Sequence, residues 1–175
     1  VDGFHPINLG RMQRNLPCFI PATPYGIMLM LDHYGIDTAG MHAVVVGRSN
    51  IVGSPMSILL ARNSNPGNCT VTLTHSRTKD LKTEVLRADL VVAAIGKKNF
   101  VTADMVKDGA IVIDVGINRE NSSETKSGFK LYGDVDFEEV VSKVKLISKV
   151  PGGVGALTTT LLINNCYEAM IKNED

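Results

Sequence analysis

Short apolar runs recur through the middle of the chain, at residues 43–46, 70–74, 90–95 and 111–115. The runs are rich in β-branched residues, and three of them show little alternation between apolar and polar positions. This pattern is typical of strands that are covered on both faces, as in a parallel sheet. A fifth run, at residues 145–150, is expected to add one more strand.

Helix-like segments lie between these runs, and each follows a residue whose side chain could cap it. The expected caps are Ser54, Thr78, Thr102 and Asp136. Pro55 suits the first helical position after Ser54, because its missing N–H group costs nothing there. The alternation of strands and helices predicts an α/β fold with a Rossmann-like, doubly wound and mostly parallel sheet.

Two apolar segments, residues 24–34 and 157–171, are expected to flank this core as further helices. The candidates for burial on the second of them are Leu161, Leu162 and Ala169. Residues 119–130 are polar and predict an exposed hairpin or loop.

The composition fits one full domain, with room for part of a second. The 175 residues are 44% hydrophobic, and 18 basic residues balance 18 acidic ones. This balance gives no sequence-wide attraction to nucleic acid or to an anionic membrane, and no apolar run is long enough to span a bilayer. Neither nucleic acid nor membrane is therefore expected as a partner.

The cysteines and histidines show no metal-binding pattern. Cys18, Cys69 and Cys166 lie far apart without C-x-x-C spacing, and the four histidines have no ligand-like spacing. No metal is expected, and the scattered cysteines favour a reducing compartment such as the cytoplasm. The chain opens at Val1 rather than at Met, so an upstream part is expected to be missing and an organellar form stays open.

A glycine-rich turn follows the first apolar run. Gly47 stands where a tight turn needs a residue without a side chain, and Gly53 comes six positions later, just before the expected helix. Backbone N–H groups at a helix start favour an anion, and Arg48 and Ser49 add a charge and a hydroxyl group. The turn therefore predicts a nucleotide phosphate site, with two plain turn glycines as the alternative.

The end of the second run bears on the choice of nucleotide. NAD-selective sheets often carry Asp or Glu there, which bonds to the ribose hydroxyls. Here the run ends in His-Ser-Arg-Thr, with no carboxylate. Ser76 and Arg77, with Arg48 nearby, would attract a 2′-phosphate, so NADP is favoured over NAD. The alternative is that Arg77 is a solvated surface charge, and His75 is expected to be a hydrogen-bonding residue rather than a catalyst.

Further glycines follow other runs. Gly96 and Gly116 come after the third and fourth runs, where the carboxyl ends of parallel strands form a ligand crevice. Residues 150–156, VPGGVGA, precede the last expected helix and could approach a flat ligand closely. Ordinary turns and a flexible linker are the alternatives.

Six longer motifs stand in order along the chain: VDGFHP.N.G at residues 1–10, GRSNIVG.PM at 47–56, HS.T at 75–78, GAIVIDVGIN at 109–118, GDV.F at 133–137 and VPGGVG..T at 150–158. Together they resemble the bifunctional methylenetetrahydrofolate dehydrogenase/cyclohydrolase family over nearly the whole chain. The resemblance implies an enzyme that oxidises 5,10-methylenetetrahydrofolate with NADP and hydrolyses the methenyl product to 10-formyltetrahydrofolate. Members of the family are usually homodimers.

The resemblance also implies site residues. The family's nucleotide contacts fall on Gly47, Arg48, Ser49, Ser76 and Ile117, to which the charge argument adds Arg77. The family's folate contacts fall on Asp2, Pro151, Gly152, Gly153, Val154 and Gly155. The implied organisation is the end of a folate domain with a connecting helix (1–36), a Rossmann-like NADP-binding domain (37–150), and a glycine-rich folate loop with a returning helix (151–175).

The chain departs from the family in three places, one of which is a longer loop at residues 119–130. The Tyr-x-x-x-Lys segment that holds the family's catalytic lysine is absent, so most of the N-terminal catalytic domain is expected to lie upstream and no catalytic residue is assigned. Ala22 stands where members usually have Cys. Two alternatives stay open: an NAD-dependent dehydrogenase in which inorganic phosphate bridges Arg48 to the shorter cofactor, and a nucleotide-binding or dimerisation module without turnover.

Overall fold

The centre of the structure is a parallel sheet of five strands in the order β2-β1-β3-β4-β7. The computed structural model describes residues 1–123, 125 and 128–171. The strands are β1 (His42–Val46), β2 (Thr70–Thr74), β3 (Leu90–Ala93), β4 (Ile111–Asp114) and β7 (Leu146–Ile147). Every pairing within this sheet is parallel, which confirms the predicted α/β, doubly wound architecture.

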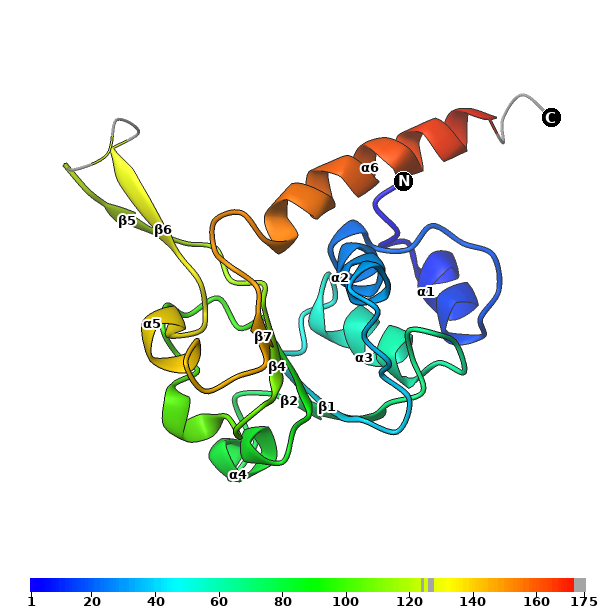
Figure 1. Ribbon diagram of the computed structural model, residues 1–175. Helices are drawn as coiled ribbons and strands as arrows, with labels where there is room; N and C mark the ends of the chain where they lie inside the picture. Colours follow the sequence, from blue (N-terminus) through cyan, green and yellow to red (C-terminus); the bar gives the residue numbers. More distant parts are fainter. Residues whose placement is uncertain (124, 126–127, 172–175) are drawn as a thin grey trace.

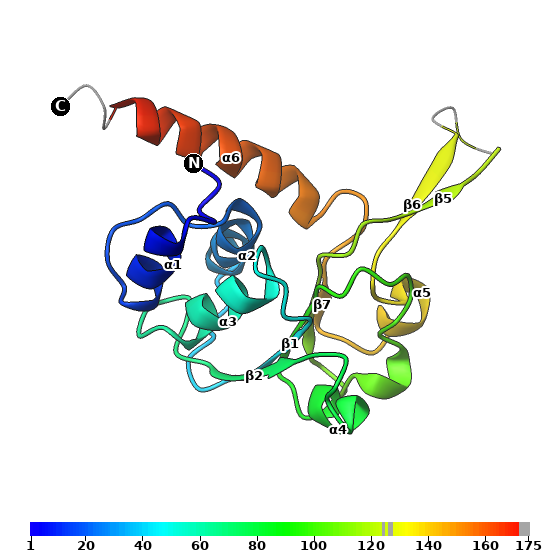
Figure 2. The same cartoon turned by 180° about the vertical axis from the view of Figure 1, so that it is seen from behind.

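Helices cover both faces of the sheet (Figure 1, Figure 2). One face carries α1 (Pro6–Gln13), α2 (Ala22–His33) and α3 (Gly53–Ala61), and the other carries α4 (Leu81–Leu86), the 3-10 helix η1 (Ala103–Met105) and α5 (Phe137–Val140). The long helix α6 (Val154–Ile171) lies against α2. Within the described residues, no helix is both long and apolar enough to cross a bilayer.

The two-sided cover explains the unbroken apolar runs of the sequence. Along β1, Ala43 and Val45 pack into the core on the α2 and α3 face, whereas Val44 and Val46 pack into the core on the opposite face. Because both sets of side chains are buried, no polar alternation is needed. Edge strand β2 differs, since Leu73 is exposed on it.

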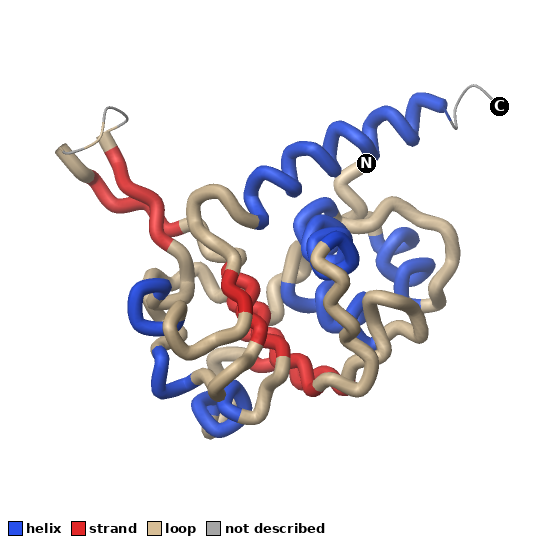
Figure 3. The backbone as a smooth tube through the Cα atoms, viewed as in Figure 1, coloured by secondary structure: helices blue, strands red, loops and turns tan. Residues whose placement is uncertain are grey.

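The polar segment 119–130 contributes to a separate two-stranded hairpin. Strands β5 (Asn118–Asn121) and β6 (Phe129–Tyr132) pair antiparallel and project away from the main sheet (Figure 3). The hairpin is therefore confirmed for its two strands, while residues 124, 126 and 127 of this prediction lie outside the described residues.

Two of the expected helix caps are wrong. Helix α3 begins at Gly53 rather than after Ser54, and Ser49 Oγ accepts hydrogen bonds from the N–H groups at its start. Helix α4 is capped by Asp80 instead of Thr78, because Asp80 Oδ1 accepts from the N–H of Thr83 at 3.1 Å. In both cases the turn before the helix brings another acceptor into reach, which residue type alone does not reveal.

The other two expected caps differ from each other. Asp136 caps α5 as expected, since its side chain accepts from the N–H of Glu139. Thr102 precedes η1 but makes no capping bond, because its hydroxyl donates to the Asp104 carboxylate instead.

Both flanking helices start earlier than expected, and one predicted burial is wrong. Helix α2 begins at Ala22, and α6 begins at Val154. Leu161 is buried as expected and Ala169 is half-buried, but Leu162 is 40% exposed. Gly26 allows the close approach of the two helices, since a Cβ there would lie 3.0 Å from the Cβ of Leu157.

We expect Gly47→Ala to destabilise the fold much more than Gly40→Ala. Both glycines have positive φ, so both changes strain the backbone by about 1–2 kcal/mol. A Cβ at Gly47 would also lie 2.2 Å from the carbonyl oxygen of Ala94, whereas a Cβ at Gly40 meets nothing within 4 Å. Urea unfolding should therefore show a loss at Gly47 that is larger by at least about 2 kcal/mol. Equal losses would contradict the steric argument.

Candidate functional site

The connections between strands create a topological switch point at the carboxyl ends of β1 and β3. The chain passes from β1 to β2 on one side and then returns to β3 on the other side of β1. Ligands of open α/β sheets bind at such a switch point, outside the carboxyl ends of the strands. The glycine turn predicted from the sequence stands at this point, directly after β1.

Two close backbone contacts shape the glycine turn. A Cβ at Gly47 would lie 2.2 Å from the carbonyl oxygen of Ala94, and a Cβ at Gly53 would lie 1.9 Å from the carbonyl oxygen of Gly47. The N–H of Gly47 donates to the carbonyl of Thr74 at 3.1 Å. The turn is thus fixed against the ends of β2 and β3 and against the start of α3.

The start of α3 differs from the expected anion site of free backbone donors. The N–H groups of Val52 and Gly53 donate to Ser49 Oγ at 3.2 and 3.3 Å, and the N–H of Ser54 donates to the Ser49 carbonyl at 3.0 Å. The next residue, Pro55, has no N–H. An anion at this turn therefore depends on the Arg48 and Ser49 side chains and on the N–H groups that precede Val52.

Cationic and hydroxyl side chains gather at the neighbouring ends of β1 and β2. Val46 pairs with Thr74, so Arg48 and Ser76 each follow the last paired residue by two positions. Four of the predicted nucleotide residues are exposed there: Arg48, Ser49, Ser76 and Arg77. The arrangement can bind a phosphate group on the β2 side of the switch point.

His75 and Asp80 are both occupied within the loop after β2. The Nδ1 atom of His75 accepts from the N–H of Arg77 at 3.1 Å, and the N–H of His75 donates to the hydroxyl of Thr78 at 3.0 Å. This confirms the expected hydrogen-bonding role of His75. Asp80 is the first carboxylate after β2 in the sequence, and it caps α4 instead of marking a ribose site.

Buried acids at the ends of β4 and β6 were missed by the sequence reasoning. Asp114 is 3% exposed, and its carboxylate accepts N–H groups of Gly116, Asp134 and Val135 at 2.8 to 3.0 Å. Burial raises the pKa of Asp114 to about 6 against the opposite effect of these donors, and the nearby Asp134 adds to the rise. The motifs Asp-Val-Gly and Gly-Asp-Val were the available signal, since each places an acid beside a glycine next to an apolar strand.

The remaining predicted nucleotide residue lies beside the predicted folate loop. Ile117 is 59% exposed and follows Gly116 at the end of β4. A Cβ at Gly155 would lie 3.8 Å from Ile117 Cδ1. The structure therefore places Ile117 of the predicted nucleotide residues next to Gly155 of the predicted folate loop.

The predicted folate loop offers mostly backbone to a ligand. Pro151, Gly152 and Gly155 are exposed and Gly153 is half-buried. Val154 is 3% exposed and packs into the core on the α2 face, so only its backbone is available to a ligand.

Asp2 does not lie next to this loop. Its Oδ1 accepts from the N–H of Phe4 at 2.9 Å, and the carbonyl of the preceding Val1 accepts from Asn165 Nδ2 at 2.8 Å. Asn165 stands eleven positions after Val154 on α6, which corresponds to about 16 Å along the helix axis. Asp2 and the glycine loop thus flank different parts of α6.

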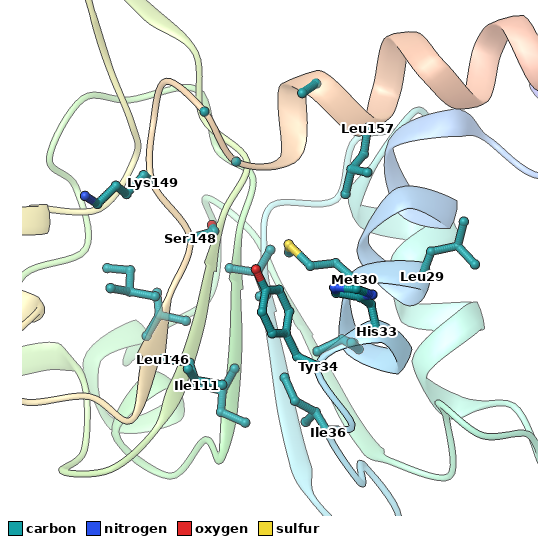
Figure 4. Close-up of a pocket in the computed structure, with 17 residues that line it drawn as sticks. Leu29, Met30, His33, Tyr34, Ile36, Ile111, Leu146, Ser148, Lys149 and Leu157 are labelled. Carbon is teal, nitrogen blue, oxygen red and sulfur yellow. The ribbon is translucent and has the colours of Figure 1, made fainter.

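A separate apolar cavity of about 810 Å³ opens between α2 and the β4–β7 edge. Tyr34 and Met30 extend into it from α2 and its C-terminal end, Ile111 and Leu146 line the opposite wall, and the Lys149 ammonium points away (Figure 4). Of the predicted site residues, only Gly152 and Gly153 line this cavity, so it does not include the glycine turn after β1.

Comparison with known proteins gives a consistent result. Residues 21–174 match the family model described as "Tetrahydrofolate dehydrogenase/cyclohydrolase, NAD(P)-binding domain". A curated relative, the bifunctional protein FolD of Cytophaga hutchinsonii, is 62% identical over 173 residues, which cover 98% of this chain and 60% of the relative. The chain therefore spans about three fifths of the length of this relative.

Two solved structures are similar in fold and in sequence. The bifunctional FolD dehydrogenase/cyclohydrolase of Campylobacter jejuni aligns with a TM-score of 0.88 and 47% identity, covering 98% of this chain and 58% of that chain. The Trypanosoma brucei enzyme, which was solved in complex with NADP cofactor and an inhibitor, aligns with a TM-score of 0.85 and 36% identity, covering 94% and 55%.

The raised pKa of Asp114 predicts a pH-dependent stability difference. Between the unfolded value of 3.8 and the folded value of about 6, the native protein holds a proton that the unfolded chain has lost. The stabilisation from this proton is complete below the lower value and is lost as the pH rises through the higher one, by up to about 3 kcal/mol.

Urea unfolding of the wild type and of Asp114→Asn between pH 4 and 7 tests this expectation. The variant cannot titrate at this position, so the wild type should lose free energy of unfolding relative to the variant as the pH rises. A constant difference across this range would contradict the prediction.

Proposed function

The chain belongs to the tetrahydrofolate dehydrogenase/cyclohydrolase family, and on that premise we propose that it is the NADP-binding part of a bifunctional folate enzyme. The longer protein would oxidise 5,10-methylenetetrahydrofolate to 5,10-methenyltetrahydrofolate and hydrolyse that product to 10-formyltetrahydrofolate. The observation that carries the proposal is the set of residues that follows β1 and β2: Arg48 and Ser76 are exposed at adjacent strand ends, and the loop after β2 has no free carboxylate.

The positive charge at the ends of β1 and β2 supports NADP as the hydride acceptor. A 2′-phosphate near Arg48, Ser76 and Arg77 would gain charge-assisted hydrogen bonds, whereas a carboxylate there would repel it. The Trypanosoma brucei relative in complex with NADP supports the same choice. The Ser49 hydroxyl, which accepts two N–H groups, retains its own proton to donate to a phosphate oxygen.

The protein's contribution to hydride transfer would be positioning. NADP supplies the hydride acceptor at its nicotinamide ring, which must lie against the carbon of the folate that is oxidised. The glycine turn would hold the phosphates, and Ile117 would contact the nicotinamide half. The exposed backbone of Pro151, Gly152 and Gly155 would face the folate from the other side.

The hydrolysis step requires a group beyond this chain. Water attack on the methenyl compound needs a polarising or proton-transferring side chain. The family's lysine for this step is not in the chain, so we assign the step to the longer protein. Asp2 is proposed as a ligand of the pterin ring. The residue before it, Val1, is hydrogen-bonded to Asn165 of α6.

Further properties of the longer protein follow from the same premise. We propose a homodimer located in the cytoplasm, with segments 1–36, 37–150 and 151–175 as the end of the folate domain, the nucleotide domain and the folate loop with its helix. Residues 172–175 of the last segment lie outside the described residues. Because α1 and α2 share a hydrophobic core with β1 and α3, the first two segments would move as one unit.

Arg48→Ala should weaken NADP binding far more than NAD binding. Loss of a charge-assisted bond to the 2′-phosphate is expected to cost about 1.5–3 kcal/mol, which is at least about tenfold in affinity. Isothermal titration calorimetry of the chain with NADP and with NAD, each with and without inorganic phosphate, measures the affinity for each nucleotide.

Arg14→Ala is the matched control, because Arg14 is an exposed arginine at the end of α1. It should change neither affinity. Equal losses for both nucleotides with Arg48→Ala would reject the 2′-phosphate contact, and a preference of the wild type for NAD with phosphate would favour the NAD-dependent alternative.

The 175-residue chain by itself should bind NADP yet lack cyclohydrolase activity. The residues proposed to bind NADP are in the chain, whereas the lysine expected for hydrolysis is not. Titration with NADP and a spectroscopic assay of methenyltetrahydrofolate hydrolysis test the two halves of this expectation. Hydrolysis at the rate of a full-length relative would contradict the assignment of that step to the upstream part.

A further inference from the structure

Asp134 is fully buried, and four N–H donors converge on its carboxylate. Its Oδ2 accepts from the backbone N–H groups of Ile95 at 2.7 Å and Gly96 at 2.8 Å. Its Oδ1 accepts from the backbone N–H of Lys97 at 2.9 Å and from Asn118 Nδ2 at 2.9 Å. One side chain therefore joins the loop after β3 to the start of β5, at the carboxyl edge of the sheet.

Glycines keep this carboxylate in a single position. A Cβ at Gly116 would lie 2.2 Å from Asp134 Oδ1, and a Cβ at Gly133 would lie 1.8 Å from Asp114 Oδ2. Asp114 in turn accepts the backbone N–H of Asp134 at 2.8 Å. Each carboxylate thus occupies the space that a Cβ on one of the two glycines would need, and neither carboxylate can move without breaking hydrogen bonds to the backbone.

The loop held by Asp134 adjoins the proposed cofactor site. The N–H of Ala94 donates to the carbonyl of Val46 at 2.8 Å, and the carbonyl of Ala94 touches the Gly47 turn. The proposed 2′-phosphate site lies on the β2 side of this turn. The other half of a dinucleotide that crosses the strand ends must then extend over β3 and β4, where Gly96 and Ile117 lie.

We propose that Asp134 is a positioning residue for the nicotinamide half of NADP, which it does not touch. It would fix residues 95–97 and Asn118 in the shape that this half of the cofactor fits. The inference rests on the proposed NADP site. A carboxylate is required because both oxygens accept hydrogen bonds, whereas an amide accepts through one oxygen only and its NH₂ group would face two of the four donors.

Asp134→Asn should weaken the binding of the nicotinamide half of the cofactor and leave the binding of the 2′-phosphate half unchanged. Titration of the chain is expected to show NADP binding weakened by about tenfold, with the affinity for 2′,5′-ADP unchanged within about twofold. The short ligand reports the phosphate site, so a general loss of structure would weaken both. Asp136→Asn is the matched control, because Asp136 caps α5 two residues away, and it should leave both affinities unchanged.

Asn118→Ala gives a milder second test if Asp134→Asn does not fold. It removes one of the four donors and is expected to weaken NADP binding by about threefold without affecting 2′,5′-ADP. The positioning role alone is overturned if the folded variant binds NADP as tightly as the wild type does. It is also overturned if the variant loses affinity for NADP and for 2′,5′-ADP to the same extent. A wild-type chain that binds neither ligand overturns the proposed function, and the inference with it.

Discussion

The turn after β1 can lie against the end of β3 only because Gly47 has no side chain. The carbonyl oxygen of Ala94 stands 2.2 Å from the place of a Cβ at Gly47, and Gly53 repeats this close approach against the carbonyl of Gly47 itself. These contacts fix where α3 starts and how the ends of β1 and β3 meet. They therefore set the distance between the turn that carries Arg48 and Ser49 and the start of the loop after β3.

The two sides of the switch point differ in how their charged side chains are placed. On the β2 side, Arg48, Ser76 and Arg77 are exposed, so they suit a ligand phosphate. On the β4 side, Asp114 and Asp134 are buried, and backbone N–H groups compensate their charge. One side thus offers charge to a ligand, while the other uses charge to hold its own loops. This division fits a ligand that is anionic at one end and flat at the other.

The sequence predicted most of the fold because the strands are covered on both faces and read as apolar runs. Residues 70–74 form a strand with the expected bounds, and Asp136 caps its helix as expected. Ser54 and Thr78 do not cap theirs, since a cap depends on which acceptor the preceding turn brings near the N–H groups. Leu162 is exposed although it is as apolar as the buried Leu161, because α6 carries apolar residues on more than one side and residue type alone does not select the buried ones.

The sequence by itself determined the parallel α/β sheet, the glycine turn after its first strand and the cationic residues at the end of its second. Local patterns suffice there, because strand burial, turn geometry and charge are properties of neighbouring residues. Only the tertiary structure decided that Ser49 closes the start of α3, that Val154 is buried, and that Asp134 holds a loop 37 to 39 residues away. The first depends on the exact shape of the turn before α3, and the other two depend on contacts between distant segments, whose free energy is absent from any local pattern.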